Sequence, residues 1–199
     1  MTAPLVLASA SQTRARMLEA AGLSVLVEPA RIDEEAIRAS LRAEGAPPRD
    51  QADKLAELKA LRVSGRRQGL LVLGADQMLV CGGKAYDKPS DRVEAAAQLA
   101  ELRGKPHELL TAAVIVRDTA PIWRHIGHAR MHMRPFSDAF IERYLQEMGD
   151  EVLETVGCYK LEGLGAQLFS RVDGDHFAVL GLPLLEILGF LRAQGVLPE

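Results

Sequence analysis

The sequence predicts an α/β protein, because short apolar runs alternate with segments that carry helical start and stop signals. Apolar runs of strand length occur at 5–8, 70–73 and 109–116. The charged, alanine-rich segments between the first two runs end at glycine or proline, as helices commonly do. No internal repeat or low-complexity tract divides the 199 residues, so we expect a single domain over residues 1–199.

The composition is typical of an ordinary soluble globular protein. The net charge is -3, with 26% charged and 48% hydrophobic residues, so no basic excess favours duplex nucleic acid as a partner. Cys81 and Cys158 lie far apart and match neither a metal-site spacing nor a disulfide framework, which favours the reducing cytoplasm. The N-terminus lacks the features of a signal peptide, and no stretch reaches the ~18 apolar residues of a membrane span. We therefore expect neither secretion nor membrane insertion.

The first strand, at 5–8, leads through a serine-rich turn into a helix at 12–21. The N-terminus of such a helix offers unpaired backbone N–H groups and the positive end of its dipole. The turn and the first helical turns add two hydroxyls and two guanidinium groups, on Ser9, Ser11, Arg14 and Arg16. This pattern is typical of a phosphate cradle. The alternative is a serine N-cap followed by two solvated arginines.

A second strand at 23–27 and two further helices are expected before the next apolar run. Acidic residues in the first turn of the second helix favour its dipole, which accounts for Glu34 without any function; a metal ligand is the alternative. Asp50 is expected to cap the third helix, which carries Lys59. Alone, a lysine on a helix is most simply interpreted as solvated.

Asp76 is the most unusual residue of the central stretch, because it lies between the apolar runs 70–73 and 78–81. An ionised carboxylate is costly to bury without partners, so Asp76 is predicted to face a cleft, a metal or a basic group. Lys88, which follows a Gly-Gly turn, is a candidate counter-charge. The alternative is that Asp76 caps a turn and Lys88 is solvated.

The second half of the chain continues the alternation of helices and strands. Glycines at 157, 163 and 165 indicate that backbone comes close to a ligand or to another chain segment, and Glu162 lies among them. The even residues from His128 to Arg134 form the polar side of a strand, which is interpreted as a basic groove edge, a subunit contact or a solvated face. The expected helices lie at 92–102, after Ser137 and at 183–193. The expected strands lie at 109–116, in a segment that ends near residue 133, and at 166–172, and a turn is expected at 173–176.

Five segments, read in order, resemble the Maf family of nucleotide pyrophosphatases, which is also described as a family of septum formation inhibitors. Their order and spacing extend over nearly the whole chain, and no single segment is specific alone. The segments are L-A-S-A-S-Q-T-R at 7–14, I-D-E-E at 32–35, E-L-K-A at 57–60, G-A-D-Q to D-K-P at 74–89, and the glycine-containing segments at 104–107 and 181–184.

The resemblance implies an α/β fold with a mixed, bent, elongated sheet, helices on both sides, and two lobes around a central cleft, similar to inosine-triphosphate pyrophosphatases. It implies a hydrolase that cleaves nucleoside triphosphates between the α and β phosphates, with Mg²⁺ or Mn²⁺ as the divalent cofactor, and a homodimer. By the same resemblance Asp76, Lys59 and Lys88 are catalytic, and Glu34 and Asp76 hold the metal. The residues implied to bind substrate are Ser9, Ser11, Arg14, Gln77 and Glu162.

The sequence departs from the family pattern after the first strand, where Thr13 replaces a tryptophan and Ala15 replaces an arginine. Gln77 and Glu162 resemble the branch that acts on 7-methyl-GTP, and a glutamate suits the N–H donors of guanine, so we expect a purine-type or broad substrate range. Ala15 favours an alternative, a nucleotide-binding regulator of cell division without turnover. A phosphohydrolase that releases inorganic phosphate is a third hypothesis.

Overall fold

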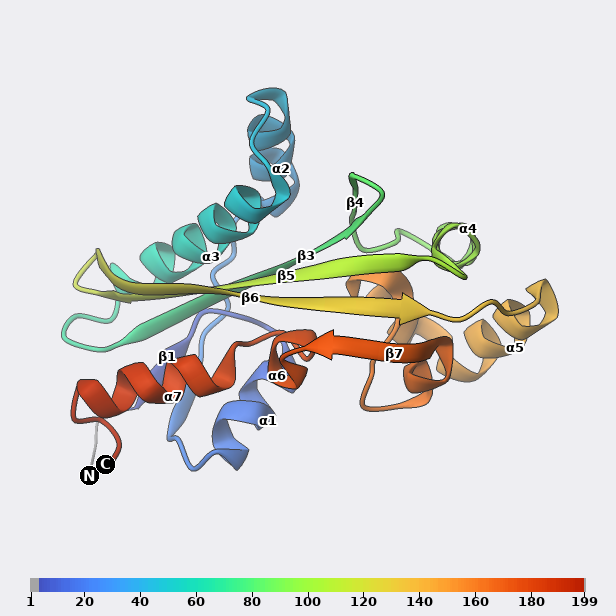
Figure 1. The fold of residues 1–199 in the computed structure, drawn as a ribbon. Helices are drawn as coiled ribbons and strands as arrows, with labels where there is room; N and C mark the ends of the chain where they lie inside the picture. The colour runs from blue at the N-terminus through green and yellow to red at the C-terminus, as the bar shows by residue number, and fades with distance from the viewer. Residues whose placement is uncertain (1–3, 199) are drawn as a thin grey trace. The chain divides into compact units, whose positions relative to one another are not determined.

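The computed structural model describes residues 4–198 and contains a seven-stranded sheet with helices packed against it (Figure 1). The strands are β1 (Leu5–Leu7), β2 (Val25–Val27), β3 (Val72–Cys81), β4 (Lys84–Tyr86), β5 (Pro106–Arg117), β6 (Ala120–Met133) and β7 (Phe169–Gly174). The α-helices are α1 (Gln12–Ala20), α2 (Glu34–Ala43), α3 (Pro48–Ser64), α4 (Arg92–Leu102), α5 (Asp138–Met148), α6 (His176–Val179) and α7 (Leu184–Ala193). Short 3₁₀ helices follow α5: η1 (Gly149–Leu153), η2 (Val156–Cys158) and η3 (Leu164–Leu168).

The sheet is mixed, with the strand order β2-β1-β3-β5-β6-β7 and with β4 paired to β3. Strand β1 runs parallel to both of its neighbours, and Leu7 lies opposite Val27 on one side and Leu73 on the other. Strands β4 and β7 pair antiparallel with β3 and β6. The predicted α/β class and the mixed sheet are confirmed. Within residues 4–198, no helix is long and apolar enough to span a membrane.

The chain divides into two compact units, and β3, β5 and β6 each contribute residues to both. Among the described residues, the first unit holds residues 4–76, 111–127 and 181–198. The second holds residues 77–110 and 128–180.

In the first unit, helix α3 lies directly on β3, while α1 and α7 lie on the other side of the strands (Figure 1). Gly74 permits this approach: a Cβ atom at this residue would lie 2.1 Å from the backbone oxygen of Ala56 and 2.8 Å from the backbone nitrogen of Ala60. Because alternate residues of a strand share a face, Asp76 points toward α3 as Gly74 does. Gly74 therefore marks a close contact inside one continuous strand rather than a break between two.

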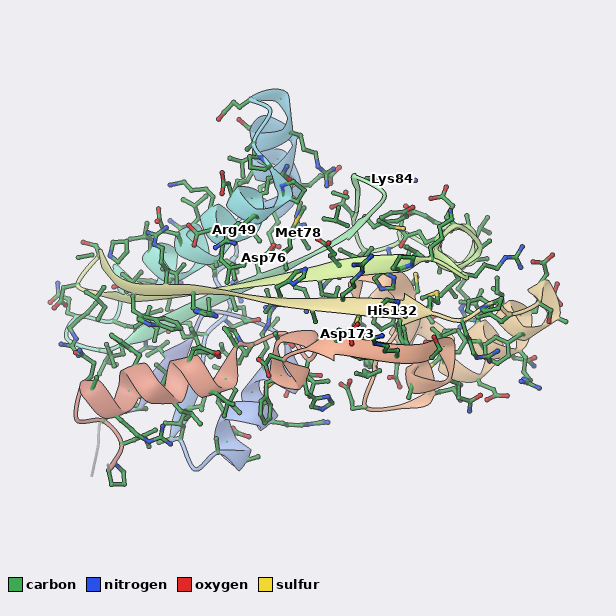
Figure 2. All side chains as sticks on the ribbon, in the orientation of Figure 1. Arg49, Asp76, Met78, Lys84, His132 and Asp173 are labelled. Atoms are coloured by element: carbon green, nitrogen blue, oxygen red, sulfur yellow. The ribbon has the colours of Figure 1, made fainter. Side chains whose placement is uncertain are left out.

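In the second unit, α4, α5 and the 3₁₀ helices cover one face of the sheet. Ala129, Met131 and Met133 are buried on that face, as the alternation predicts, whereas His128 and Arg130 are exposed on the other. On the exposed face His132 lies beside Asp173 of β7, with Nε2 3.0 Å from Oδ2 (Figure 2). This polar face carries its own ion pairs and lies outside the apolar core.

Two glycines of the second unit lie where the backbone meets another segment of the chain. A Cβ atom at Gly157 would lie 2.5 Å from Leu79, and one at Gly165 would lie 2.5 Å from the backbone oxygen of Lys160. For Gly157 the close approach of another chain segment, one of the two reasons that the sequence predicted, is confirmed. At Gly165 the contact is local, with a residue five positions earlier.

Three of the predicted elements differ clearly from the structure. Helix α3 begins at Pro48 with Pro47 as its N-cap, not with Asp50 as the cap. A proline is tolerated there because the N–H groups of the first helical turn have no acceptor within the helix, so the N–H that proline lacks is not needed. The strand expected over 166–172 begins only at Phe169, after η3. The turn expected at 173–176 is instead the end of β7 followed by the N-cap of α6, where Asp175 accepts from two backbone N–H groups.

Candidate active site

Asp76 lies inside β3, so the hypothesis that it caps a turn was wrong. Its side chain is only 5% exposed and points toward α3 (Figure 2). Lys59 of α3 donates from Nζ to Asp76 Oδ1 over 2.8 Å. The same Nζ lies 2.9 Å from Oε2 of Glu34, the first residue of α2. The structure thus brings together three predicted residues that are distant in the chain. Glu34 precedes Lys59 by 25 residues, and Lys59 precedes Asp76 by 17.

Arg38 is a member of this cluster that was not expected from the sequence. Its Nη2 lies 3.2 Å from both carboxylate oxygens of Asp76 and 3.5 Å from Glu34 Oε2. Arg38 lies four residues after Glu34 in α2, and residues at this spacing face each other on a helix. That spacing is the signal that could have identified it. We call Glu34, Arg38, Lys59 and Asp76 the carboxylate cluster.

The two acids and two bases of the carboxylate cluster compensate each other. A buried carboxylate is tolerated only when charged or hydrogen-bonded partners replace its water, and removal of one partner of a buried pair typically costs about 3–5 kcal/mol. Asp76 and Lys59 are both almost fully buried, whereas the Glu34 side chain is 44% exposed. The cluster is therefore closed on the β3 side and reaches solvent through Glu34.

The serine turn after β1 forms a hydrogen-bonded loop at the start of α1. Ser11 is the N-cap and accepts from the backbone N–H of Arg14 over 3.3 Å, while the Ser11 N–H donates to Ser9 Oγ over 3.2 Å. Arg14 Nη1 donates to Ser9 Oγ and to the backbone oxygen of Ala75, the residue before Asp76. The N-cap is confirmed, and the turn is tied to the strand that carries Asp76. Arg16 is exposed on α1.

The Arg14 guanidinium has a double role in this geometry. Its Nε donates to the backbone oxygen of Gly181 over 2.8 Å, so three of its five N–H groups hold backbone and Ser9 in place. Burial lowers the pKa of Arg14, and the nearby carboxylates of Asp76 and Glu34 raise it. Arginine has such a high intrinsic pKa that it stays charged, and Arg14 adds positive potential beside the carboxylate cluster.

Glu34 and Asp76, the predicted metal ligands, both point at Lys59 Nζ. Within residues 4–198 no group of three histidine, cysteine, aspartate or glutamate side chains is placed to hold a metal ion. Mg²⁺, however, is commonly bound by one or two carboxylates, with water and substrate phosphates as the other ligands. Two carboxylates that converge on one cation fit that mode of binding.

Comparison with known proteins identifies the family. The family model described as "Maf-like protein" matches residues 4–194. The chain belongs to the Maf family. A relative from Hyphomonas neptunium is 50% identical over 198 residues, covering 100% of both chains, and one from Paramagnetospirillum magneticum is 52% identical over 192 residues, covering 96% of this chain and 99% of its own. Both carry the name "Nucleoside triphosphate pyrophosphatase".

Among solved structures, a nucleoside-triphosphatase (dITP/XTP pyrophosphatase) from Mycobacterium abscessus covers 98% of this chain and 98% of its own. The TM-score is 0.41 and the sequence identity is 15%.

The departure from the Maf family pattern at Ala15 has a structural correlate. Ala15 is 4% exposed and lies on the buried side of α1. The neighbouring Arg14 supplies the guanidinium that reaches the turn.

The other residues that the Maf resemblance selects belong to the second unit. Gln77 follows Asp76 on β3, and its Nε2 donates to the backbone oxygens of Ala178 and Val179 over 2.9 and 3.2 Å. Lys88 is exposed after β4, and Glu162 is exposed in the turn before η3. Roles for Lys88 and Glu162 at the site of Asp76 stay predictions.

Proposed function

We propose that this Maf family protein is a nucleoside triphosphate pyrophosphatase that cleaves the bond between the α and β phosphates. The observation that carries the proposal is the buried carboxylate of Asp76, held between Lys59 and Arg38 and next to the serine turn. Full-length relatives about half identical to this chain carry that activity in their names, which supports the same reaction class. The products would be a nucleoside monophosphate and pyrophosphate.

The proposed reaction is an attack of water on the α phosphorus. The water oxygen forms a bond to phosphorus, the bond to the oxygen that bridges to the β phosphate breaks, and pyrophosphate leaves with that oxygen. The water proton passes to Asp76 and then to solvent. Asp76 Oδ1 accepts from both Lys59 and Arg38, whereas Oδ2 accepts from Arg38 over 3.2 Å. Oδ2 is therefore the oxygen with more capacity to orient the water.

The serine turn and Lys59 would hold the phosphate oxygens. Hydroxyl and backbone N–H donors at a helix N-terminus suit an anion, and an ammonium group neutralises charge that moves onto the departing pyrophosphate. Lys88 is proposed to serve the same purpose. Glu34 and Asp76 would bind Mg²⁺ or Mn²⁺, which when bound neutralises phosphate charge and polarises the phosphoryl group.

For the base, we propose a purine-type or broad preference in which Glu162 accepts from base N–H donors. Gln77 contributes indirectly in this proposal, because both N–H groups of its amide hold the backbone of α6. The homodimer implied by the resemblance and the cytoplasmic location favoured by the cysteine spacing stay predictions.

A product-resolved assay tests the proposed function. The purified chain is incubated with Mg²⁺ or Mn²⁺ and a panel of common nucleotides, 7-methyl-GTP, inosine triphosphate and methylated pyrimidine triphosphates, and monophosphate, pyrophosphate and phosphate are separated. We expect monophosphate and pyrophosphate in equal amounts, and a loss of at least about 100-fold in kcat for Asp76→Asn. Asp50→Asn, an exposed aspartate of α3, is the matched control and should keep full activity.

Two results would favour the other hypotheses. Tight nucleotide binding without any product would support a non-hydrolysing regulator. Inorganic phosphate as the first product would support a different phosphohydrolase. Unchanged pyrophosphate release by Asp76→Asn would contradict the role of Asp76 itself.

A further inference from the structure

Two protein cations lie between the same two carboxylates. Lys59 Nζ is 2.9 Å from Glu34 Oε2 and 2.8 Å from Asp76 Oδ1. Arg38 Nη2 is 3.5 Å from Glu34 Oε2 and 3.2 Å from each oxygen of Asp76. The carboxylates proposed to bind a divalent metal are therefore already bridged twice by side chains of the chain itself.

The two bridging cations differ in how firmly they are held. Lys59 is buried on α3, which packs directly on β3 at Gly74, and its two contacts are short. Arg38 comes from α2, a helix without a single buried residue among those described, and its contacts are longer. The side chains of Arg38 and Lys59 are 14% and 8% exposed, so both are largely buried, and the longer contacts of Arg38 make it the cation that is displaced at lower cost.

The formal charge of the carboxylate cluster also distinguishes the two states. With Glu34 and Asp76 ionised and both cations present, the cluster sums to zero, so an incoming divalent ion finds no net attraction. Without the Arg38 charge the same cluster is negative by one unit. Arg14 adds the same positive potential in both states, so the difference between the two states favours the ion. A triphosphate that arrives with the metal removes this obstacle, because its oxygens accept readily from a guanidinium group.

We propose that Arg38 is a placeholder cation. It neutralises Asp76 and Glu34 while no metal is bound, and it leaves them when the metal and the triphosphate bind together. Arg38 is thus a positioning residue that couples metal binding to nucleotide binding. This inference rests on the proposed function, because it takes Glu34 and Asp76 as the metal ligands.

The test measures the binding of Mn²⁺ alone, by calorimetry or by the loss of the free-ion electron paramagnetic resonance signal, on the full chain without nucleotide. We expect Arg38→Gln to bind Mn²⁺ at least about tenfold more tightly than the wild type, because one positive charge beside the ion is gone. Arg38→Lys keeps the charge and should stay close to the wild type. Arg42→Gln, an exposed arginine near the end of the same helix, is the control for a general loss of positive charge.

A second measurement repeats the titration with a triphosphate analogue that has a methylene group between the α and β phosphorus atoms. In the wild type the analogue should increase the Mn²⁺ affinity by a larger factor than in Arg38→Gln, since the variant has no cation to displace. Mn²⁺ affinity that is equal or weaker in Arg38→Gln, at unchanged circular dichroism, overturns the inference even if the wild type releases pyrophosphate. If Arg38→Gln binds Mn²⁺ more tightly than the wild type, but the wild type releases no pyrophosphate, only the proposed function is contradicted.

Discussion

At the scale of single residues, Glu34 and Glu35 form a natural comparison because both lie in the first turn of α2. Only Glu34 contacts Lys59, and Glu35 is exposed. A glutamine at either position removes the same favourable interaction with the helix dipole, worth about 0.3–1 kcal/mol. The two substitutions therefore differ mainly in the contact to Lys59.

We expect Glu34→Gln to lower kcat/KM for pyrophosphate release by about 10–100-fold, which corresponds to the loss of one charge-assisted contact. Glu35→Gln should stay within about twofold of the wild type. Steady-state kinetics at several Mg²⁺ concentrations measure both values. Equal effects of the two substitutions would show that Glu34 acts only through the helix dipole.

His107 is a second informative residue, because it is buried in the core of the second unit. Its Nε2 lies 2.8 Å from the hydroxyl oxygen of Tyr159, and among the described residues its buried Nδ1 has no hydrogen-bond partner. Burial, with a smaller contribution from His132, lowers the pKa of His107 from 6.5 to about 4. The protonated ring carries a hydrogen on both nitrogens, so in that form the Nδ1–H group has no acceptor among the described residues.

Because the pKa of His107 is lower in the folded state, the unfolded chain binds the proton first as the pH falls. The contribution to stability is complete above pH 6.5 and is lost between pH 6.5 and about 4, by up to about 3 kcal/mol. Denaturant unfolding across this range should show a shallower loss for His107→Gln than for the wild type. His128→Gln, at an exposed position, serves as the control and should leave the slope unchanged.

At the scale of elements, the contact between α3 and β3 determines where Lys59 meets Asp76. Gly74→Ala would place a Cβ atom 2.1 Å from the backbone oxygen of Ala56, and backbone cannot move aside cheaply. We expect a loss of about 3 kcal/mol in the free energy of unfolding, measured with urea, and a lower kcat because α3 carries Lys59.

Gly189→Ala is the matched control for this substitution. Gly189 lies within α7, and a Cβ atom there meets nothing within 4 Å. The alanine should raise the free energy of unfolding by about 1 kcal/mol through helix propensity. A Gly74→Ala variant as stable as the wild type would contradict the close contact seen between α3 and β3.

At the scale of the whole molecule, ligand binding at the carboxylate cluster should raise the stability of the chain. Mn²⁺ with the methylene triphosphate analogue at about 100 times its Kd should raise Tm by roughly 5–10 °C, because a ligand that binds only the folded state stabilises it. Asp76→Asn should abolish this shift. A shift of the same size in Asp76→Asn would place the ligand elsewhere on the protein.

Much of the fold was predictable from local pattern. The apolar runs predicted β1, β2 and the middle of β5, and the alternation of residues predicted which side of β6 is buried. Boundaries that depend on tertiary contact were less predictable. Gly74 follows the apolar run 70–73 in the sequence and looks like its end, yet it lies within β3. A glycine is needed there because α3 approaches the strand too closely for any side chain.

Most residues of the candidate site were predictable from the sequence, but the contacts between them were not. Asp76, Lys59 and Glu34 could be selected because a buried carboxylate requires charged partners and because the motifs resemble those of the Maf family. Arg38 could not be ranked above the other arginines, since a spacing of four residues on a helix is common and only the fold brings α2 to Asp76.

The sequence by itself determined the α/β class, the family and the need of Asp76 for positive partners, because these depend on residue type and order along the chain. The tertiary structure alone decided which cations answer that need. Lys59 and Arg38 come from two different helices, and their contacts with the Asp76 carboxylate depend on how α2 and α3 pack in the first unit. Contacts between residues distant in the chain are set by packing, which local pattern does not encode.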